Sequence, residues 1–186
     1  LGILTVGVVT RPFAFEGKRR IEQANNGISE LRERVDALVI IPNDRLKLVS
    51  DQKITLQNAF EVADNVLRQA VQSISELITV PGLINLDFAD VCSIMRNAGY
   101  AHMGVGRAGG KEKAEEAAKM AIQSPLLETS IDGARGVILN ITGPLDLVME
   151  DTDLIGSMVQ NAIHPDGLVI TGIALDETLD DEIRVT

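Results

Sequence analysis

The stretch "ITLQNAFEVADNVLRQAVQSISELI", residues 54–78, carries a long helical pattern. At 1.5 Å per residue, a helix of this length extends roughly 35–40 Å, more than a small domain needs. Its apolar residues spread beyond one stripe, which indicates burial on several sides, and Pro81-Gly82 ends the pattern. We therefore expect a spine helix between two domains. The apolar residues at helical spacing are Leu56, Ala59, Ala63, Val66, Ala70, Ile74 and Leu77.

The segment before this helix has the pattern of an α/β domain. Two near-continuous aliphatic runs, "LGILTVGVVT" (residues 1–10) and "VDALVIIP" (residues 35–42), are typical of parallel strands covered on both faces. A helical pattern from Lys18 to about Val35 lies between them. The order strand, helix, strand predicts a βαβ unit with the usual right-handed crossover.

The segment after the spine helix alternates between short helices and strands. The predicted fold class is therefore α/β plus α+β: part of an α/β domain (1–53), a long central helix (54–80) and a compact α+β domain (81–186). In the last part we expect helices over 88–99, 111–125 and 152–164, and strands over 100–109, 133–143, 166–176 and 182–186.

Composition excludes several classes of function. A hydrophobic share of 45% supports a real core, whereas the net charge of −10 disfavours nucleic acid and anionic membranes as partners. The longest apolar runs are about half the roughly 20 residues that span a bilayer, so no membrane insertion is expected. A single cysteine, Cys92, excludes an internal disulfide and fits a reducing cytoplasm. Because the chain begins at Leu1 and stops at Thr186 inside strand-like runs, we expect a fragment.

Two carboxylates three residues apart, Asp87 and Asp90, can be explained in two ways. An Asp at a helix start, followed three residues later by a second acid, resembles a capping box and complements the helix dipole. Alternatively, two carboxylates on one face can orient and polarise a water molecule that attacks a phosphoanhydride. The spacing alone favours capping, and one pair could serve both roles.

Polar residues that could bind a nucleotide follow the two predicted strands. Glu16, in "TRPFAFEGKRR" (residues 10–20), could accept hydrogen bonds from ribose, and Arg20 could neutralise phosphate. Asn43, at the end of the second strand, could bind a purine edge. Taken alone, however, the first segment is more simply a solvated basic helix start and the second a turn.

Phe60 and Asp64 lie four residues apart, on one face of the spine helix. The ring could stack on a base, while the carboxylate accepts from the ring N–H and exocyclic amine that guanine presents. Phe60 as an ordinary core residue is the favoured alternative. Asp64 is harder to explain on a helix this apolar.

Other conspicuous residues predict no site. "GVGRAGG" (residues 104–110) does not match the dinucleotide-binding fingerprint, so tight turns explain its glycines better. Cys92, His102 and His164 lack metal-ligand spacing, and no metal site is expected.

Five colinear segments closely resemble the bacterial cell-division GTPases of the tubulin/FtsZ family: "LTVGVVTRPFAFEGKRR" (4–20), "VDALVIIPNDRL" (35–46), "NAFEVADNVL" (58–67), "GLINLDFADV" (82–91) and "SPLLETSIDGARGVILNITG" (124–143). The resemblance implies part of a Rossmann-like GTPase domain, a long central helix and a C-terminal α+β domain. It implies GTP or GDP, with Mg²⁺ accompanying the nucleotide in the whole protein. It also implies subunits that stack head to tail in the cytoplasm, at the division site.

The same resemblance assigns roles to the candidate residues. Asn85, Asp87 and Asp90 would form the catalytic loop that enters the neighbouring subunit's nucleotide pocket. Glu16 and Arg20 would serve the sugar and phosphate side.

By the same match, Asn43, Phe60 and Asp64 would hold guanine. If one active site is shared by two subunits, neither preorganises the transition state alone, and hydrolysis is coupled to assembly.

The sequence also departs from the family pattern. The family's glycine-rich phosphate loops would precede Leu1, and the closing strands and the tail that recruits other division proteins would follow Thr186. Lys113 stands where the family has Arg, and Cys92 where a basic residue is common. Two alternatives stay open: the chain alone as a non-enzymatic capping module of filaments, or another member of the tubulin/FtsZ superfamily.

Overall fold

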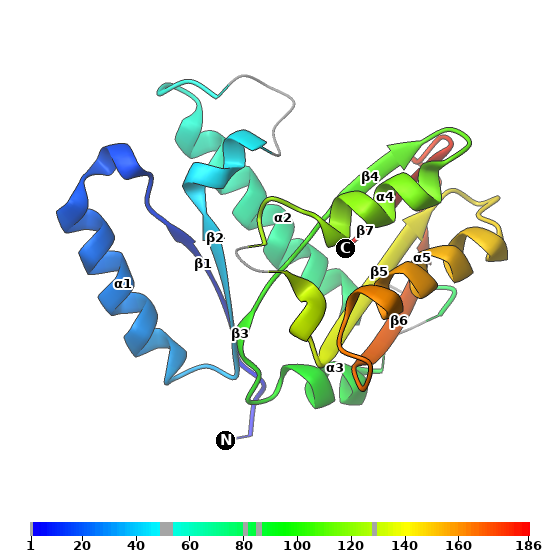
Figure 1. Cartoon of the computed structure of the whole chain (residues 1–186), viewed down its shortest axis with the longest axis horizontal. Helices are drawn as coiled ribbons and strands as arrows, with labels where there is room; N and C mark the ends of the chain where they lie inside the picture. The colour runs from blue at the N-terminus through cyan, green and yellow to red at the C-terminus, as the bar shows by residue number, and fades with distance from the viewer. Residues whose placement is uncertain (1, 49–53, 80–81, 85–86, 128–129) are drawn as a thin grey trace. The chain divides into compact units, whose positions relative to one another are not determined.

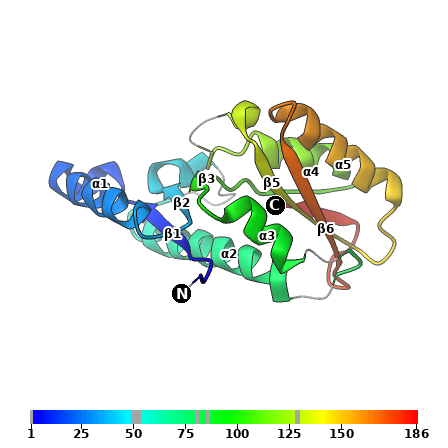
Figure 2. The ribbon, with the colours of Figure 1, turned by 90° about the horizontal axis from the view of Figure 1, so that it is seen from below.

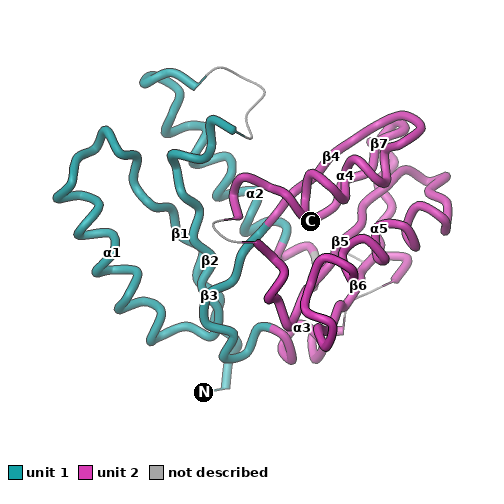
Figure 3. The backbone as a smooth tube through the Cα atoms, viewed as in Figure 1, with its two compact units in different colours: residues 1–73, 95–103 teal, residues 74–94, 104–186 magenta. Residues whose placement is uncertain are grey.

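The chain forms two compact units (Figure 3). The computed structural model describes residues 2–48, 54–79, 82–84, 87–127 and 130–186. The first unit comprises residues 1–73 and 95–103, and the second comprises residues 74–94 and 104–186. The domain limits predicted from the sequence, at residues 53 and 80, stay predictions.

The first unit contains a three-stranded parallel sheet in the order β1-β2-β3. Strand β2 lies in its centre, and all six of its residues are buried, as the aliphatic run predicts for a strand covered on both faces. Helix α1 and the first part of α2 flank the sheet (Figure 1 and Figure 2). The elements of this unit are β1 (Val6–Arg11), α1 (Lys18–Arg32), β2 (Ala37–Pro42), β3 (Gly99–Ala101) and, up to residue 73, α2 (Ala59–Thr79), with 3-10 turns η1 (Ala14–Glu16) and η2 (Asn43–Leu48).

The predicted βαβ unit is present in this sheet. β1 and β2 pair in parallel over six residues, from Val6 opposite Ala37 to Arg11 opposite Pro42, and α1 connects them. Ile28 of α1 packs with Leu38 of β2 in a small buried cluster. Because both strands run the same way, the loops that follow them leave the same edge of the sheet.

Helix α2 begins at Ala59, five residues later than its apolar pattern predicts. Before it, Asn58 Oδ1 accepts a hydrogen bond from the backbone N–H of Thr55 at 2.7 Å, and Ala59 N–H donates to the Thr55 carbonyl at 3.0 Å. Such local side-chain bonds favour a turn or cap over a continued helix. Residues 59–73 of α2 belong to the first unit and residues 74–79 to the second.

The second unit is built on a four-stranded mixed sheet in the order β4-β7-β5-β6. β5 and β6 pair in parallel over eight residues, and β7 is antiparallel to both β4 and β5. The elements are α3 (Phe88–Met95), β4 (Gly106–Gly109), α4 (Lys113–Ile122), η3 (Ile131–Gly133), β5 (Gly136–Gly143), α5 (Met149–Ala162), β6 (Leu168–Leu175) and β7 (Glu182–Val185).

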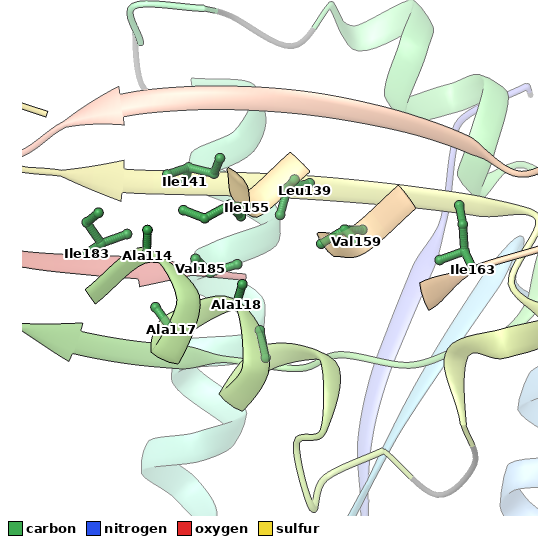
Figure 4. Packing of buried hydrophobic residues seen from close by; sticks show 11 residues of the cluster. Ala114, Ala117, Ala118, Leu139, Ile141, Ile155, Val159, Ile163, Ile183 and Val185 are labelled. Carbon is green, nitrogen blue, oxygen red and sulfur yellow. The ribbon is translucent and has the colours of Figure 1, made fainter. Parts of the chain in front are cut away.

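The core of the second unit lies between this sheet and helices α4 and α5. Figure 4 shows side chains from α4, α5, β5 and β7 converging on one another. The glycine at position 106 of β4 allows α4 to approach closely. A Cβ added at Gly106 would collide with the Ala117 carbonyl oxygen and lie 2.8 Å from the Ala121 nitrogen. Gly104 and Gly106 therefore serve helix packing, whereas Gly110, with φ of +88°, serves the turn that the sequence predicts.

The strand predicted over residues 100–109 is wrong as a single element. It divides into β3, which pairs with β2 in the first sheet, and β4, which pairs with β7 in the second. The run carries no local signal for a break into two strands, and strand pairing depends on distant partners that periodicity does not specify.

Candidate nucleotide site and carboxylate loop

Glu16 is held by local bonds in the loop that follows β1. Its Oε1 accepts from the backbone N–H of Phe13 at 2.9 Å, and its Oε2 lies 3.4 Å from Nε of Arg20. The Glu16 side chain is 15% exposed and that of Arg20 68%. Gly17, with φ of +95°, turns the chain from η1 into α1 in a conformation that other residues rarely adopt. The predicted carboxylate and cation thus lie together at the carboxyl edge of the sheet.

The loop after β2 supplies two further polar side chains at this edge. Asn43 is 5% exposed, and its Oδ1 is buried without a hydrogen-bond partner among the residues that the structure describes. The carboxylate of Asp44 accepts from the backbone N–H of Ala14, with both oxygens 3.2 Å from that nitrogen. The two loops are therefore joined, and Asn43 offers an unused amide oxygen beside the junction.

An aromatic cluster brings α2 to the same loop. The rings of Phe13 and Phe15 stack with centroids 5.1 Å apart, and Phe60 of α2 meets them edge to face at 5.7 and 6.2 Å. Phe13 is buried, whereas Phe15 and Phe60 are 55% and 50% exposed. Phe60 is thus not an ordinary core residue, because half of the residue's accessible surface is open to solvent.

Asp64 lies one helical turn beyond Phe60, and its side chain is exposed. The structure thus brings Glu16, Arg20, Asn43 and Phe60 to one edge of the first unit, with Asp64 following on α2. Their roles toward a nucleotide stay predictions.

Sequence reasoning missed three members of this group: Phe13, Phe15 and Asp44. Two signals for them are present in the sequence. The aromatic residues immediately precede Glu16, and Asp44 directly follows Asn43 at the strand end.

The second candidate set belongs to the second unit, at the start of α3. Asp87 Oδ1 accepts from the backbone N–H of Ala89 at 3.1 Å, and the Asp87 carbonyl accepts from the N–H groups of Asp90 and Val91 at 2.9 and 3.2 Å. Asp87 therefore caps the helix, as the spacing favours. Both Asp87 and Asp90 have exposed side chains, so capping leaves their carboxylates open to solvent. Asn85, the third predicted member, lies outside the described residues.

Lys113, which departs from the family pattern, has a defined partner. Its Nζ lies 2.7 Å from Oδ1 of Asp181, in the turn between β6 and β7. The hydrogen bond with Asp181 raises the pKa of Lys113, and the same bond lowers the pKa of Asp181. Lys113 therefore links the start of α4 to the turn that precedes β7.

Neither a metal-binding cluster nor a membrane-spanning helix occurs among the residues that the structure describes. Within residues 2–48, 54–79, 82–84, 87–127 and 130–186, no group of three or more His, Cys, Asp or Glu side chains could hold a metal ion. In the same ranges, no helix is long and apolar enough to cross a membrane.

Comparison with known proteins identifies the family. Residues 1–51 match the model of the tubulin/FtsZ family GTPase domain, and residues 99–186 match that of the FtsZ family C-terminal domain. An empty FtsZ dimer from M. jannaschii has a TM-score of 0.93 and 43% identity over 99% of this chain. The chain belongs to the tubulin/FtsZ family.

The chain spans about half the length of the solved structures compared here. The chain covers 53% of the empty M. jannaschii FtsZ chain, and 55% of a mutant of that protein with the same TM-score and identity. The GDP-bound CetZ1 monomer from Haloferax volcanii has a TM-score of 0.72 at 16% identity, over 97% of this chain and 53% of its own. At that identity only the fold is shared.

The tubulin/FtsZ fold confirms the predicted fold class. The parallel sheet of the first unit and the mixed sheet of the second are the α/β and α+β parts that the sequence predicts. The two FtsZ structures compared above are archaeal, so the bacterial origin that the resemblance implies gains no support from them.

Proposed function

We propose that the protein to which this chain belongs is an FtsZ-type GTPase that assembles head to tail. Its first unit would hold the nucleoside part of GTP, and the loop with Asp87 and Asp90 would act on the GTP of the next subunit. The observation that carries the proposal is the half-exposed Phe60 ring, which packs edge to face on the loop of Glu16 at the carboxyl edge of a parallel sheet. Self-association is supported by the dimer of the related M. jannaschii FtsZ.

The side chains of the candidate nucleotide site suit different parts of GTP. The half-exposed Phe60 ring would stack on a base, and Asp64 is an acceptor for the two donors on the guanine edge. Asn43 Oδ1 is a further buried acceptor, in the loop after β2. Glu16 would accept from ribose hydroxyls, and Arg20 would face a phosphate oxygen.

Hydrolysis requires a water molecule placed in line with the bond that breaks. Asp87 and Asp90 would orient this water toward the γ-phosphorus and accept its proton as the new P–O bond forms and the β–γ bridging bond breaks. The described residues include no acidic cluster that could hold Mg²⁺ by itself. The ion would accompany the phosphates of the nucleotide and neutralise their charge.

A mixing experiment tests whether the two parts act across subunits. In the full-length protein, Asp87→Ala should bind GTP but fail to hydrolyse it in a neighbour, whereas Phe60→Ala should bind GTP poorly but retain its carboxylate loop. Each variant alone should be nearly inactive. A mixture should recover activity, because GTP on an Asp87→Ala subunit meets an intact loop from a Phe60→Ala subunit.

The result that contradicts this proposal is equally definite. If the mixture is no more active than the sum of its parts, while each variant co-assembles with the wild type, the carboxylates do not act in trans. Loss of GTP binding by Asp87→Ala would also contradict it, because the proposal gives that residue no part in binding the nucleotide of its own subunit.

The remaining expectations about cellular role rest on the same relationship. We propose a cytoplasmic location at the division site and recruitment of other division proteins outside these 186 residues. The identity of 43% to FtsZ, against 16% to CetZ1, supports the division protein over other members of the superfamily.

The 186-residue chain by itself could act as a capping module, since it matches about half of a subunit. Titrating it into full-length filaments and sedimenting them tests this alternative. Unchanged polymer mass rejects capping.

A further inference from the structure

One hydrogen bond links the loops that follow β1 and β2. The carboxylate of Asp44 lies on η2, directly after the fully buried strand β2, and accepts from the backbone N–H of Ala14 with both oxygens at 3.2 Å. Thirty residues separate the partners, so the bond is tertiary. The first residue of η1 is thus hydrogen-bonded to the turn that follows the most deeply buried strand of the sheet.

The bond lies beside the one that holds Glu16. At the start of η1, the backbone N–H groups of Phe13 and Ala14 both point out of the turn, where no helical carbonyl is available. Glu16 accepts from Phe13 at 2.9 Å and Asp44 accepts from Ala14. Each of these adjacent donors therefore has a separate carboxylate.

We propose that Asp44 is a positioning residue that keeps the Glu16 carboxylate available for the ribose hydroxyls of the nucleotide. The inference rests on the proposed function of Glu16. Without Asp44, the Ala14 N–H loses its acceptor, and Glu16, which already serves the neighbouring N–H on the same short turn, becomes the alternative carboxylate. Its oxygens would then be drawn toward the backbone and away from a sugar.

The strands offer a matched control at their opposite edge. There Asp36 Oδ2 accepts from the backbone N–H of Thr5 at 2.9 Å, just before β2 and β1 begin. The bond is of the same type and joins the same pair of strands. Asp36→Ala removes an equivalent link without touching the loop of Glu16, so it reports the purely structural effect of losing one such bond.

The test compares GTP with 2′,3′-dideoxy-GTP, which lacks both ribose hydroxyls, in direct binding to the full-length protein. The variants are Asp44→Ala, Asp44→Asn and Asp36→Ala. In the wild type, loss of the hydroxyls should weaken binding about tenfold, as expected for hydrogen bonds to a charged group. In Asp44→Ala this ratio should fall to about twofold or less, because GTP binds more weakly while the dideoxy analogue binds as before.

The conservative variant should behave differently. Asp44→Asn retains a side-chain oxygen that can accept from Ala14, so it should restore most of the wild-type ratio. Asp36→Ala should leave the ratio unchanged. Ala14→Pro removes the donor itself, at a position where the start of a turn tolerates proline, so no unsatisfied N–H is left to draw Glu16 toward the backbone. Ala14→Pro should therefore keep the wild-type ratio, and it should restore that ratio when combined with Asp44→Ala.

Three outcomes overturn the proposal. One is an unchanged ratio in folded Asp44→Ala, and another is an equal drop of the ratio in Asp36→Ala. The third is a wild type that binds GTP but does not discriminate against the dideoxy analogue, which leaves nucleotide binding intact. A wild type that binds no GTP overturns the proposed function as well, and so separates the two failures.

Discussion

The carboxylate of Asp87 lies 3.1 Å from the backbone nitrogen of Ala89, so the side chain proposed to activate water also caps helix α3. The two functions use different features of one group. Capping needs only an oxygen acceptor, whereas proton acceptance needs the charge. Substitutions that remove one feature at a time can therefore separate them.

Asp87→Asn should retain helix stability and lose hydrolysis. Asparagine caps helices as well as aspartate does, but its amide does not accept a proton, so turnover should fall about a hundredfold or more. Asp87→Ala should lose hydrolysis to the same extent and also lose about 1 kcal/mol of stability. Single-turnover hydrolysis and thermal unfolding of the full-length protein measure both effects. Near-normal turnover in Asp87→Asn would exclude the carboxylate from proton transfer.

Asp64→Asn should change the base that the protein prefers. Guanine presents two donors to a carboxylate, whereas xanthine presents one donor and one carbonyl acceptor, which suits an amide. We expect GTP affinity to fall about tenfold or more and the preference to move toward xanthosine triphosphate. Competition binding with the two nucleotides measures this. Glu61→Gln, on the same exposed turn of α2, is the matched control. An equal change of nucleotide preference in Glu61→Gln would mean that the loss of one negative charge, not the loss of the Asp64 carboxylate, causes the effect.

The Lys113–Asp181 pair should make stability depend on pH at both extremes. The hydrogen bond with Lys113 lowers the pKa of Asp181 below its ordinary 3.8, so its contribution is present above that pH and is lost as the pH falls further. The bond raises the pKa of Lys113 above its ordinary 10.5, so that contribution is present below that pH and disappears as the pH rises beyond it.

Asp181→Asn isolates this pair. Asparagine tolerates the positive φ of 49° at this position, so the backbone is preserved while the charge is removed. Thermal unfolding should show the wild type more stable between the two extremes and equal to the variant below the folded pKa of Asp181. Asp176, whose pKa is lowered by the Thr178 hydroxyl, contributes equally in both proteins. A difference that persists at the acid extreme would argue against the pair as its cause.

Gly106→Ala should destabilise the second unit by about 2 kcal/mol or more, because the added methyl group meets the backbone of α4 and neither partner can yield cheaply. Gly156→Ala is the matched control. Gly156 lies within α5, where nothing is within 4 Å of an added Cβ, so alanine should stabilise the helix by up to about 1 kcal/mol. Shifts of opposite sign in the unfolding temperature would distinguish packing from helix propensity.

Elements with a local sequence signal could be predicted, and those fixed by distant partners could not. The aliphatic run of β2 and the helical spacing of α1 are local signals, and both elements are present within a few residues of their expected limits. The division of residues 100–109 between two sheets depends on pairing with β2 and β7, which lie far away in the sequence. Asp44 escaped notice for the same reason, since its partner is thirty residues away.

The site follows the same rule. Residue type and spacing single out Phe60 and Asp87, but they do not show that Phe60 is half exposed or that the Asp87 carboxylate caps a helix. Those properties arise only when α2 meets the loop after β1, or when α3 has formed.

The placement of β3 has a consequence for the order in which the protein is made. The first sheet receives its third strand from residues 99–101, which follow the whole of α3 in the sequence. On a ribosome, that sheet stays one strand short until residues that begin the other unit have already emerged. The open side of β2 is then an unpaired hydrophobic edge, the kind of surface that invites association with other chains. We therefore expect the nascent chain to be most vulnerable to aggregation after β2 has emerged and before residues 99–101 have emerged.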